Sequence, residues 1–258
     1  MAIIDIITYN GEKDVFDIRY NVLKDFVDKF IVVEAKTTFS GQNKPLYFEE
    51  VKSKYPKAYY YINDENYTKE EEKIASSSPN TQGAKHWKRE FMQKERISAA
   101  LNGLEDEDIC FICDCDEVWN PEVLKHNIDQ IYRLKFLSYC YYLNNMSSET
   151  WDSSLVLKYK DIRGKVLNHV RGNKNNYKAI DNAGWHFTFM GGVDEVKRKL
   201  ANSYTEDTYW NKDIQSKIDT RFAANTDFLG RSYRYWTDDS QLPKYVIENK
   251  DKYAHLFK

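Results

Sequence analysis

The chain has 258 residues, and its 41% hydrophobic content suits one globular domain with a well-buried core. Its 38 Lys and Arg nearly balance its 40 Asp and Glu, and the resulting net charge of -2 argues against general binding of nucleic acid. No apolar run reaches the ~20 residues of a membrane span, and the N-terminus lacks a signal-peptide pattern, so we expect a cytoplasmic protein without a membrane anchor.

The first part of the chain alternates between strand and helix patterns. An apolar run at residues 3–7 predicts a strand, apolar spacings of four and three within residues 14–29 predict an amphipathic helix, and residues 30–34 predict a second strand. This order implies a parallel pair with a right-handed crossover. Residues 47–61 are expected to form a helix that leads into a third strand at 58–62.

A polar segment and a helix precede the most informative stretch of the chain. Residues 63–83 predict a long exposed loop, of the kind that often has a function. Good helix formers fill residues 86–101, and Gly103 then stops the helix. An apolar run starts at Asp108 and ends in the carboxylates of Asp114, Asp116 and Glu117, which predicts a buried strand with acids at its end.

The second half of the chain mixes strands and helices. Asn120 as cap and Pro121 in the first turn predict a helix start. Further patterns predict strands at 135–143, 154–159 and 185–189, a helix at 193–204, and mostly helical structure from 209 to 258. The fold class is therefore expected to be an α/β sandwich with a mostly parallel central sheet, flanked by helices, and a mixed, helical C-terminal part.

Polar residues follow three of the predicted strands. Ligands of such folds bind beyond the carboxyl ends of the strands. Asn10, Glu34 and the acids from Asp114 to Glu117 fall at such ends, so we expect them to face one crevice. Residues alternate between the faces of a strand, so Asp114 and Asp116 can point the same way and share one divalent cation.

The Asp-x-Asp pattern at a strand end serves two chemistries. In nucleotide-sugar glycosyltransferases of the GT-A type it holds Mn²⁺ or Mg²⁺ on the donor diphosphate, and in haloacid-dehalogenase-like phosphatases its first Asp is the nucleophile. The phosphatase pattern normally opens its domain and needs a later pair of acids. Here more than a hundred residues come first, and the later pair Asp238 and Asp239 follows a poor candidate for a buried strand. A third interpretation is that these acids only cap the helix at Asn120.

Six ordered blocks carry a more specific signal. They are residues 14–19, 27–34, 38–41, 89–93, 114–117 and 183–186. Together they resemble glycosyltransferase family 17, and the resemblance extends from about residue 3 to residue 257. It implies a single GT-A-like (Rossmann-related) domain over residues 1–258, with a nucleotide-sugar-binding half at 1–118 and an acceptor-binding half at 119–258. It also implies a metal-dependent, inverting enzyme that uses UDP-GlcNAc or a related hexose donor.

The resemblance implies roles for individual residues. The expected ligands of Mn²⁺ or Mg²⁺ are Asp114, Asp116 and His186. The expected contacts to the UDP-sugar are Asn10, Glu34, Arg89, Lys94, Asp114 and Trp185, and of the two basic residues Arg89 matches its block better. Inversion needs a general base near the acceptor hydroxyl, for which the candidates are Glu117, Asp181, Asp194 and Glu195.

The aromatic second half departs from the family pattern. The match to the glycoprotein enzymes is not close there, and acceptor choice depends on such segments. The residues concerned include Tyr141, Tyr142, Trp151, Trp210, Tyr235 and Trp236. We therefore expect a bacterial or viral enzyme whose acceptor is a surface polysaccharide or another glycan. The remaining alternatives are the phosphatase, with Asp114 as nucleophile, and a carbohydrate-binding protein without catalysis.

Overall fold

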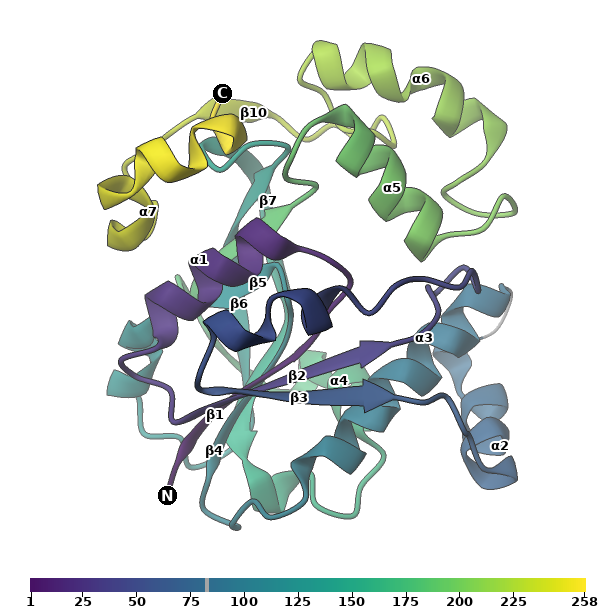
Figure 1. The fold of residues 1–258 in the computed structure, drawn as a ribbon, viewed down its shortest axis with the longest axis vertical. Coiled ribbons are helices and arrows are strands. Elements are labelled where there is room, and N and C mark those ends of the chain that lie inside the picture. Colours follow the sequence, from purple (N-terminus) through teal and green to yellow (C-terminus); the bar gives the residue numbers. More distant parts are fainter. Residues whose placement is uncertain (82–83) are drawn as a thin grey trace.

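The computed structural model describes residues 1–81 and 84–258 as an α/β fold (Figure 1). Its strands are β1 Ile3–Thr8, β2 Lys29–Ala35, β3 Ala58–Asn63, β4 Ile109–Asp114, β5 Glu117–Trp119, β6 Tyr132–Cys140, β7 Asn145–Lys158, β8 Lys178–Ile180, β9 Gly184–Thr188 and β10 Tyr235–Thr237. Its α-helices are α1 Lys13–Leu23, α2 Lys69–Ser77, α3 Lys85–Glu95, α4 Leu167–Gly172, α5 Val193–Ser203, α6 Lys212–Ala223 and α7 Lys244–Glu248.

The first part of the sheet is parallel, as the strand and helix order predicts. Strand β1 lies between β2 and β4, and Ile6 pairs with Ile31 on one side and Ile112 on the other. Both faces of this part are covered. Ile6 packs toward Ile97 and Leu101, which follow α3. On the opposite face Ile7 and Phe111 belong to the cluster of Phe16 on α1. Burial on both faces explains the nearly continuous apolar runs of these strands.

The second part of the sheet is mixed, so the expectation of a mostly parallel sheet is wrong there. The strand order is β3-β2-β1-β4-β7-β6-β9-β5, with β10 and β8 paired to β7 and β6. Strand β7 is antiparallel to both β4 and β6, and its pairing with β6 follows from the short connection after Cys140, which turns the chain straight back. The mostly polar residues 145–153 extend β7 well beyond the predicted start at Ser154, since strand pairing does not require apolar side chains.

The predicted loop at 63–83 contains helix α2. Thr68 accepts the Glu71 N–H at 3.2 Å, and Glu71 Oε2 accepts the Thr68 N–H at 2.7 Å, which is a capping box. The spacing Thr-x-x-Glu was visible in the sequence, but the high polarity of the segment favoured a loop. The end of this prediction, residues 82–83, lies outside the described residues. Two short 3-10 turns at Tyr47–Glu50 and Lys52–Lys54 replace the helix expected before β3.

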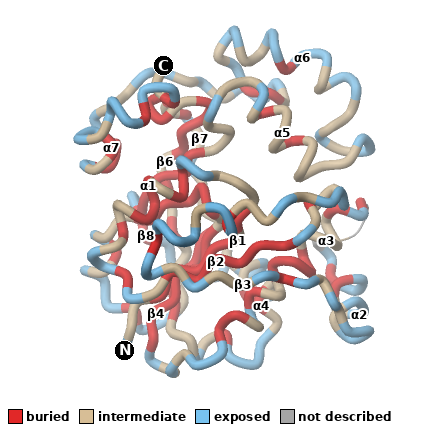
Figure 2. Tube along the Cα trace, in the orientation of Figure 1, coloured by how far each residue is buried: buried red, intermediate tan, exposed pale blue. Residues whose placement is uncertain are grey.

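The C-terminal part covers one end of the sheet. Helix α5 packs on α6 through the cluster of Val196, Leu200 and Ile218, and α7 lies beside α1, where Val246 packs near Ile18. Figure 2 shows buried residues along the central strands and mostly exposed ones on α6. None of the helices in the described part of the chain has the length and apolar character to span a bilayer. The division into two functional halves stays a prediction.

Candidate active site

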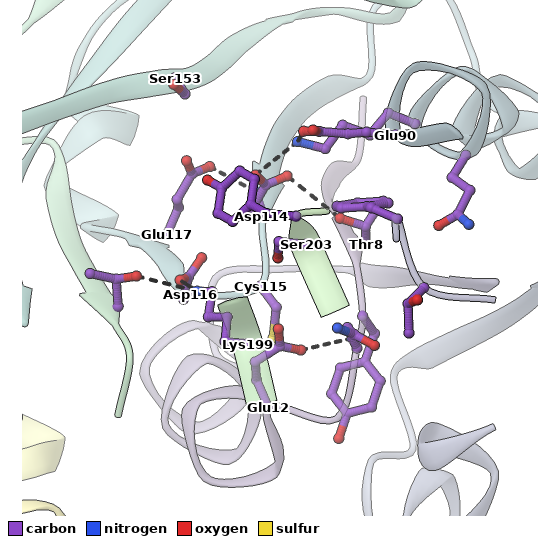
Figure 3. Close-up of a pocket in the computed structure, with 18 of the residues that line it drawn as sticks. Thr8, Glu12, Glu90, Asp114, Cys115, Asp116, Glu117, Ser153, Lys199 and Ser203 are labelled. Carbon is purple, nitrogen blue, oxygen red and sulfur yellow. Dashed lines mark hydrogen bonds and ion pairs between the residues drawn. The ribbon is translucent and has the colours of Figure 1, made fainter. Parts of the chain in front are cut away.

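A pocket of about 460 Å³ lies at the carboxyl ends of β1, β2 and β4 (Figure 3). Thr8 pairs with Val33 on β2 and with Asp114 on β4, so the three strand ends lie side by side. Asn10 and residues 114–117 line the pocket, as predicted, together with side chains of α3, β7, β9 and α5. Glu34 does not line it, because its neighbours Val33 and Ala35 face the pocket and alternation turns Glu34 to the other face.

The turn between Asp114 and Glu117 is rigidly held. The Glu117 carboxylate is fully buried and accepts hydrogen bonds from the Asp114 N–H at 2.7 Å, from Ser154 Oγ at 2.5 Å, and from Trp151 Nε1. Arg19 on α1 donates to the carbonyls of Asp114 at 3.2 Å and Glu117 at 2.7 Å. Glu117 therefore fixes the shape of the turn, and its oxygens are already occupied by donors.

Asp114 faces two cations. Its Oδ2 lies 3.0 Å from Lys94 Nζ on α3, and its Oδ1 lies 3.4 Å from an Arg171 nitrogen on α4. Thr8 Oγ1 lies 3.5 Å from the same Oδ1. Burial raises the pKa of Asp114, but the charges of Lys94 and Arg171 outweigh it, so this pKa lies below its usual range. Asp114 is thus ionised and holds the two cations at the wall of the pocket.

Asp116 points to a different part of the pocket. Its Oδ2 accepts a hydrogen bond from Lys199 Nζ on α5 and lies 3.5 Å from His186 Nε2 on β9. The His186 ring stacks on Trp151, with 4.6 Å between centroids. Burial raises the pKa of Asp116, but Lys199 and His186 outweigh it and bring this pKa far below its usual range. The two acids of the motif therefore have separate sets of partners.

The predicted metal ligands are only partly brought together. Asp116 Oδ2 and His186 Nε2 face each other, whereas both oxygens of Asp114 are turned to Lys94 and Arg171. Within residues 1–81 and 84–258, no three His, Cys, Asp or Glu side chains gather as a metal site. An oxygen and an imidazole nitrogen suit Mn²⁺. Asp116 and His186 are thus the two predicted ligands that the fold brings face to face.

Two predicted donor contacts have structural partners instead. Glu34 is fully buried and accepts hydrogen bonds from Lys44 Nζ at 2.7 Å, Tyr60 Oη at 2.8 Å, and two backbone N–H groups. Arg89 donates to the Phe39 carbonyl at 2.7 Å, and a side chain at Gly41 would collide with its guanidinium. Arg89 thus holds the loop that carries Phe39, whereas Lys94, five residues later, lines the pocket.

Three other predicted residues lie outside the pocket lining. Trp185 is buried, and its Nε1 donates to the Gln241 carbonyl at 2.5 Å, which ties the C-terminal segment to β9. Asp181 pairs with Lys135 at 3.0 Å, and its side chain is 72% exposed. Asp194 lies in the first turn of α5, where a negative charge favours the helix dipole.

Sequence reasoning missed Lys199, Arg171 and Glu12. Lys199 lies three residues after Val196 and one before Leu200, both fully buried, so its place beside the apolar stripe of α5 was readable. Arg171 lies on the short helix α4, whose sequence has no clear amphipathic pattern. Glu12 lines the pocket and accepts the Asn10 N–H at 2.7 Å, and burial raises its pKa. These residues come from separate segments, which only folding brings together.

An aromatic wall, which we define as Trp87, Phe189, Tyr204, Tyr209 and Phe228, lines one side of the pocket. Trp87 meets Tyr204 edge to face at 6.0 Å between centroids, and Tyr204 meets Tyr209 in the same way at 5.0 Å. Aromatic faces of this kind can stack on the apolar faces of sugar rings. The arrangement as a whole combines acids, cations and aromatic rings in one cavity.

Comparisons with known proteins identify the family of the chain. The model of the family described as Glycosyltransferase family 17 matches residues 1–219, which confirms the resemblance seen in the sequence. The enzymes named beta-1,4-mannosyl-glycoprotein 4-beta-N-acetylglucosaminyltransferase from Rattus norvegicus and Homo sapiens are each 21% identical to the chain over 98% of its length. The chain spans 54% of each of these relatives.

Solved structures overlay only loosely. An active-site mutant of LgtC has a TM-score of 0.34 and 10% identity, and the match covers 88% of this chain and 84% of that one. The inositol-1-phosphate CTP transferase from T. maritima has a TM-score of 0.32 and 11% identity, with 100% and 98% covered.

Proposed function

Because the chain belongs to glycosyltransferase family 17, we propose that it transfers a sugar from a nucleotide-sugar donor to a hydroxyl group of a glycan acceptor. The observation that carries this proposal is the arrangement at the end of β4, where Asp114 and Asp116 lie between cations in one pocket. UDP-GlcNAc is the first donor to test, since the relatives are named N-acetylglucosaminyltransferases. The phosphatase alternative loses support. It needs a later pair of acids in the site, and Asp239 of the candidate pair instead forms an ion pair with Lys250 outside the pocket lining.

Asp116 and His186 would hold a divalent cation, Mn²⁺ or Mg²⁺. Their facing oxygen and nitrogen support this assignment. When bound there, the cation would neutralise the negative charge that develops on the departing diphosphate. Lys94 and Arg171, fixed by Asp114, add two positive charges from the opposite side of the motif. Asn10, which follows β1 and lines the pocket, would contact the nucleotide.

The acceptor would bind against the aromatic wall and near β7. Glu149 of β7 lines the pocket in the half predicted to bind the acceptor, and its carboxylate accepts a hydrogen bond from the neutral Tyr233 hydroxyl. Glu12 is bonded to the backbone beside β1. Glu90 is paired with Lys94. We therefore propose Glu149 as the general base that removes the proton of the attacking hydroxyl, in place of the candidates named from the sequence.

Donor turnover with matched variants tests the proposed function. The protein is incubated with Mn²⁺ and a panel of nucleotide sugars that includes UDP-GlcNAc, and release of nucleoside diphosphate is measured with and without glycan acceptors. We expect release that Asp116→Asn abolishes and Asp181→Asn leaves unchanged, since only Asp116 lines the pocket. If no nucleotide sugar binds or turns over, or if both variants behave like the wild type, the proposal is wrong.

A variant of Glu149 tests the proposed base separately. Glu149→Gln removes the proton acceptor and keeps the shape, so kcat should fall by about 10²-fold or more with little change in donor affinity. Glu12→Gln serves as the comparison within the same pocket. A larger loss in the Glu12 variant would transfer the role to that residue.

A further inference from the structure

Lys199 occupies the side of Asp116 that a metal would need. Its ammonium contacts Asp116 Oδ2 (Figure 3). The same oxygen faces His186 Nε2, and the ammonium lies 3.2 Å from Thr188 Oγ1. The Lys199 side chain is 25% exposed and the Asp116 side chain is 8% exposed. Both side chains line the pocket, and the lysine is the more exposed of the two.

The ammonium and a divalent cation compete for the same oxygen. A metal that coordinates Asp116 Oδ2 must take the place of a tethered positive charge, and two cations at this distance repel each other strongly in a partly dry site. The lysine stem has four flexible carbons, so the ammonium can move without a change in the backbone of α5. To move at little cost it needs an anionic partner other than Asp116. Glu12, whose charge also acts on Lys199, is held by the Asn10 N–H, whereas the diphosphate of a nucleotide would bring further anionic oxygens into the same pocket.

We infer that Lys199 closes the cation site in the free protein, and that a nucleoside diphosphate opens the site by drawing the ammonium onto its phosphate oxygens. This inference rests on the proposed function, because it assumes that a diphosphate and a divalent cation bind in this pocket. Its consequence is an order of binding. The metal binds weakly alone and tightly after the nucleotide, since Asp116 is then free.

Binding of Mn²⁺ without turnover tests the inference. Free Mn²⁺ is measured by electron paramagnetic resonance in titrations of the wild type, Lys199→Gln and Lys199→Met, with and without UDP. Lys197→Gln is the control, because Lys197 lies on the same helix but pairs with Asp219 outside the pocket. Circular dichroism shows which variants are folded. Lys199 is replaced by one polar and one apolar residue, and a single folded variant of the two suffices for the test.

We expect the Lys199 variants to bind Mn²⁺ without UDP about tenfold more tightly than the wild type, the size of one lost charge-assisted hydrogen bond. Their affinity for UDP without metal should fall, and the gain in Mn²⁺ affinity on adding UDP should shrink. Equal Mn²⁺ affinities of the wild type and the Lys199 variants without UDP would overturn the inference alone. If neither Mn²⁺ nor UDP binds to any of these proteins, the proposed function fails as well.

Discussion

Replacing Arg19 by Met should destabilise the fold by about 3–5 kcal/mol, the loss expected when one partner of a buried ion pair is removed. Arg19 and Asp5 are both fully buried, and the guanidinium meets the carboxylate through two hydrogen bonds of 2.6 and 2.5 Å. Without Arg19, Trp119 Nε1, at 2.9 Å, would be the one side-chain donor left to the Asp5 carboxylate among the described residues. The Glu117 carbonyl would also lose its 2.7 Å bond.

The free energy of unfolding is measured by urea denaturation of the wild type and Arg19→Met. The double variant Asp5→Asn with Arg19→Met separates the causes, because it removes the unpaired charge and keeps a polar group near Trp119. We expect the double variant to recover at least about 1 kcal/mol of the loss, since the uncompensated charge is the largest part of it. A single variant that loses less than about 1 kcal/mol, or a double variant no more stable than the single, would refute this reasoning.

Three further predictions concern the pocket and the thiols. Lys94→Met should weaken UDP binding by about tenfold in calorimetric titration, because one charge-assisted contact is lost, while Lys85→Met, at the exposed start of α3, should not. Tyr209→Ala, in the half predicted to bind the acceptor, should raise the acceptor KM and leave donor affinity unchanged in steady-state kinetics; a selective loss of donor affinity would count against the aromatic wall as the acceptor side. Burial raises the pKa of three thiols to about 12, so native protein at pH 8 should resist iodoacetamide, as read by mass spectrometry, whereas urea-unfolded protein should react fully; the thiols are Cys110, Cys113 and Cys140.

Patterns local in the chain led to the strand ends of the site. The parallel order of the first strands followed from strand and helix alternation, and that order brings Thr8, Asn10 and Asp114 to one edge of the sheet. Side chains alternate between the two faces of a strand, so Glu34 must face away from its neighbours Val33 and Ala35. Since those two line the pocket, Glu34 does not. The family also came from ordered local blocks, which the family model confirms.

The roles within the motif depended on partners far away in the chain. The Glu117 carboxylate accepts hydrogen bonds from Trp151 and Ser154 of β7. The sequence alone does not place β7 beside β4, so it does not show that these donors leave Glu117 unavailable as a base. The mixed pairing of the second half likewise followed from a short turn after Cys140 that no periodicity reveals.

Sequence by itself determined that an acidic pair ends a buried strand in a family 17 chain, because burial and alternation act between neighbours. Only the tertiary structure decided how that pair is used. In the fold, Asp114 pairs with Lys94 and Arg171, and Asp116 pairs with Lys199 and His186. Ion pairs form between groups that the fold brings within a few ångströms, whatever their separation in the chain.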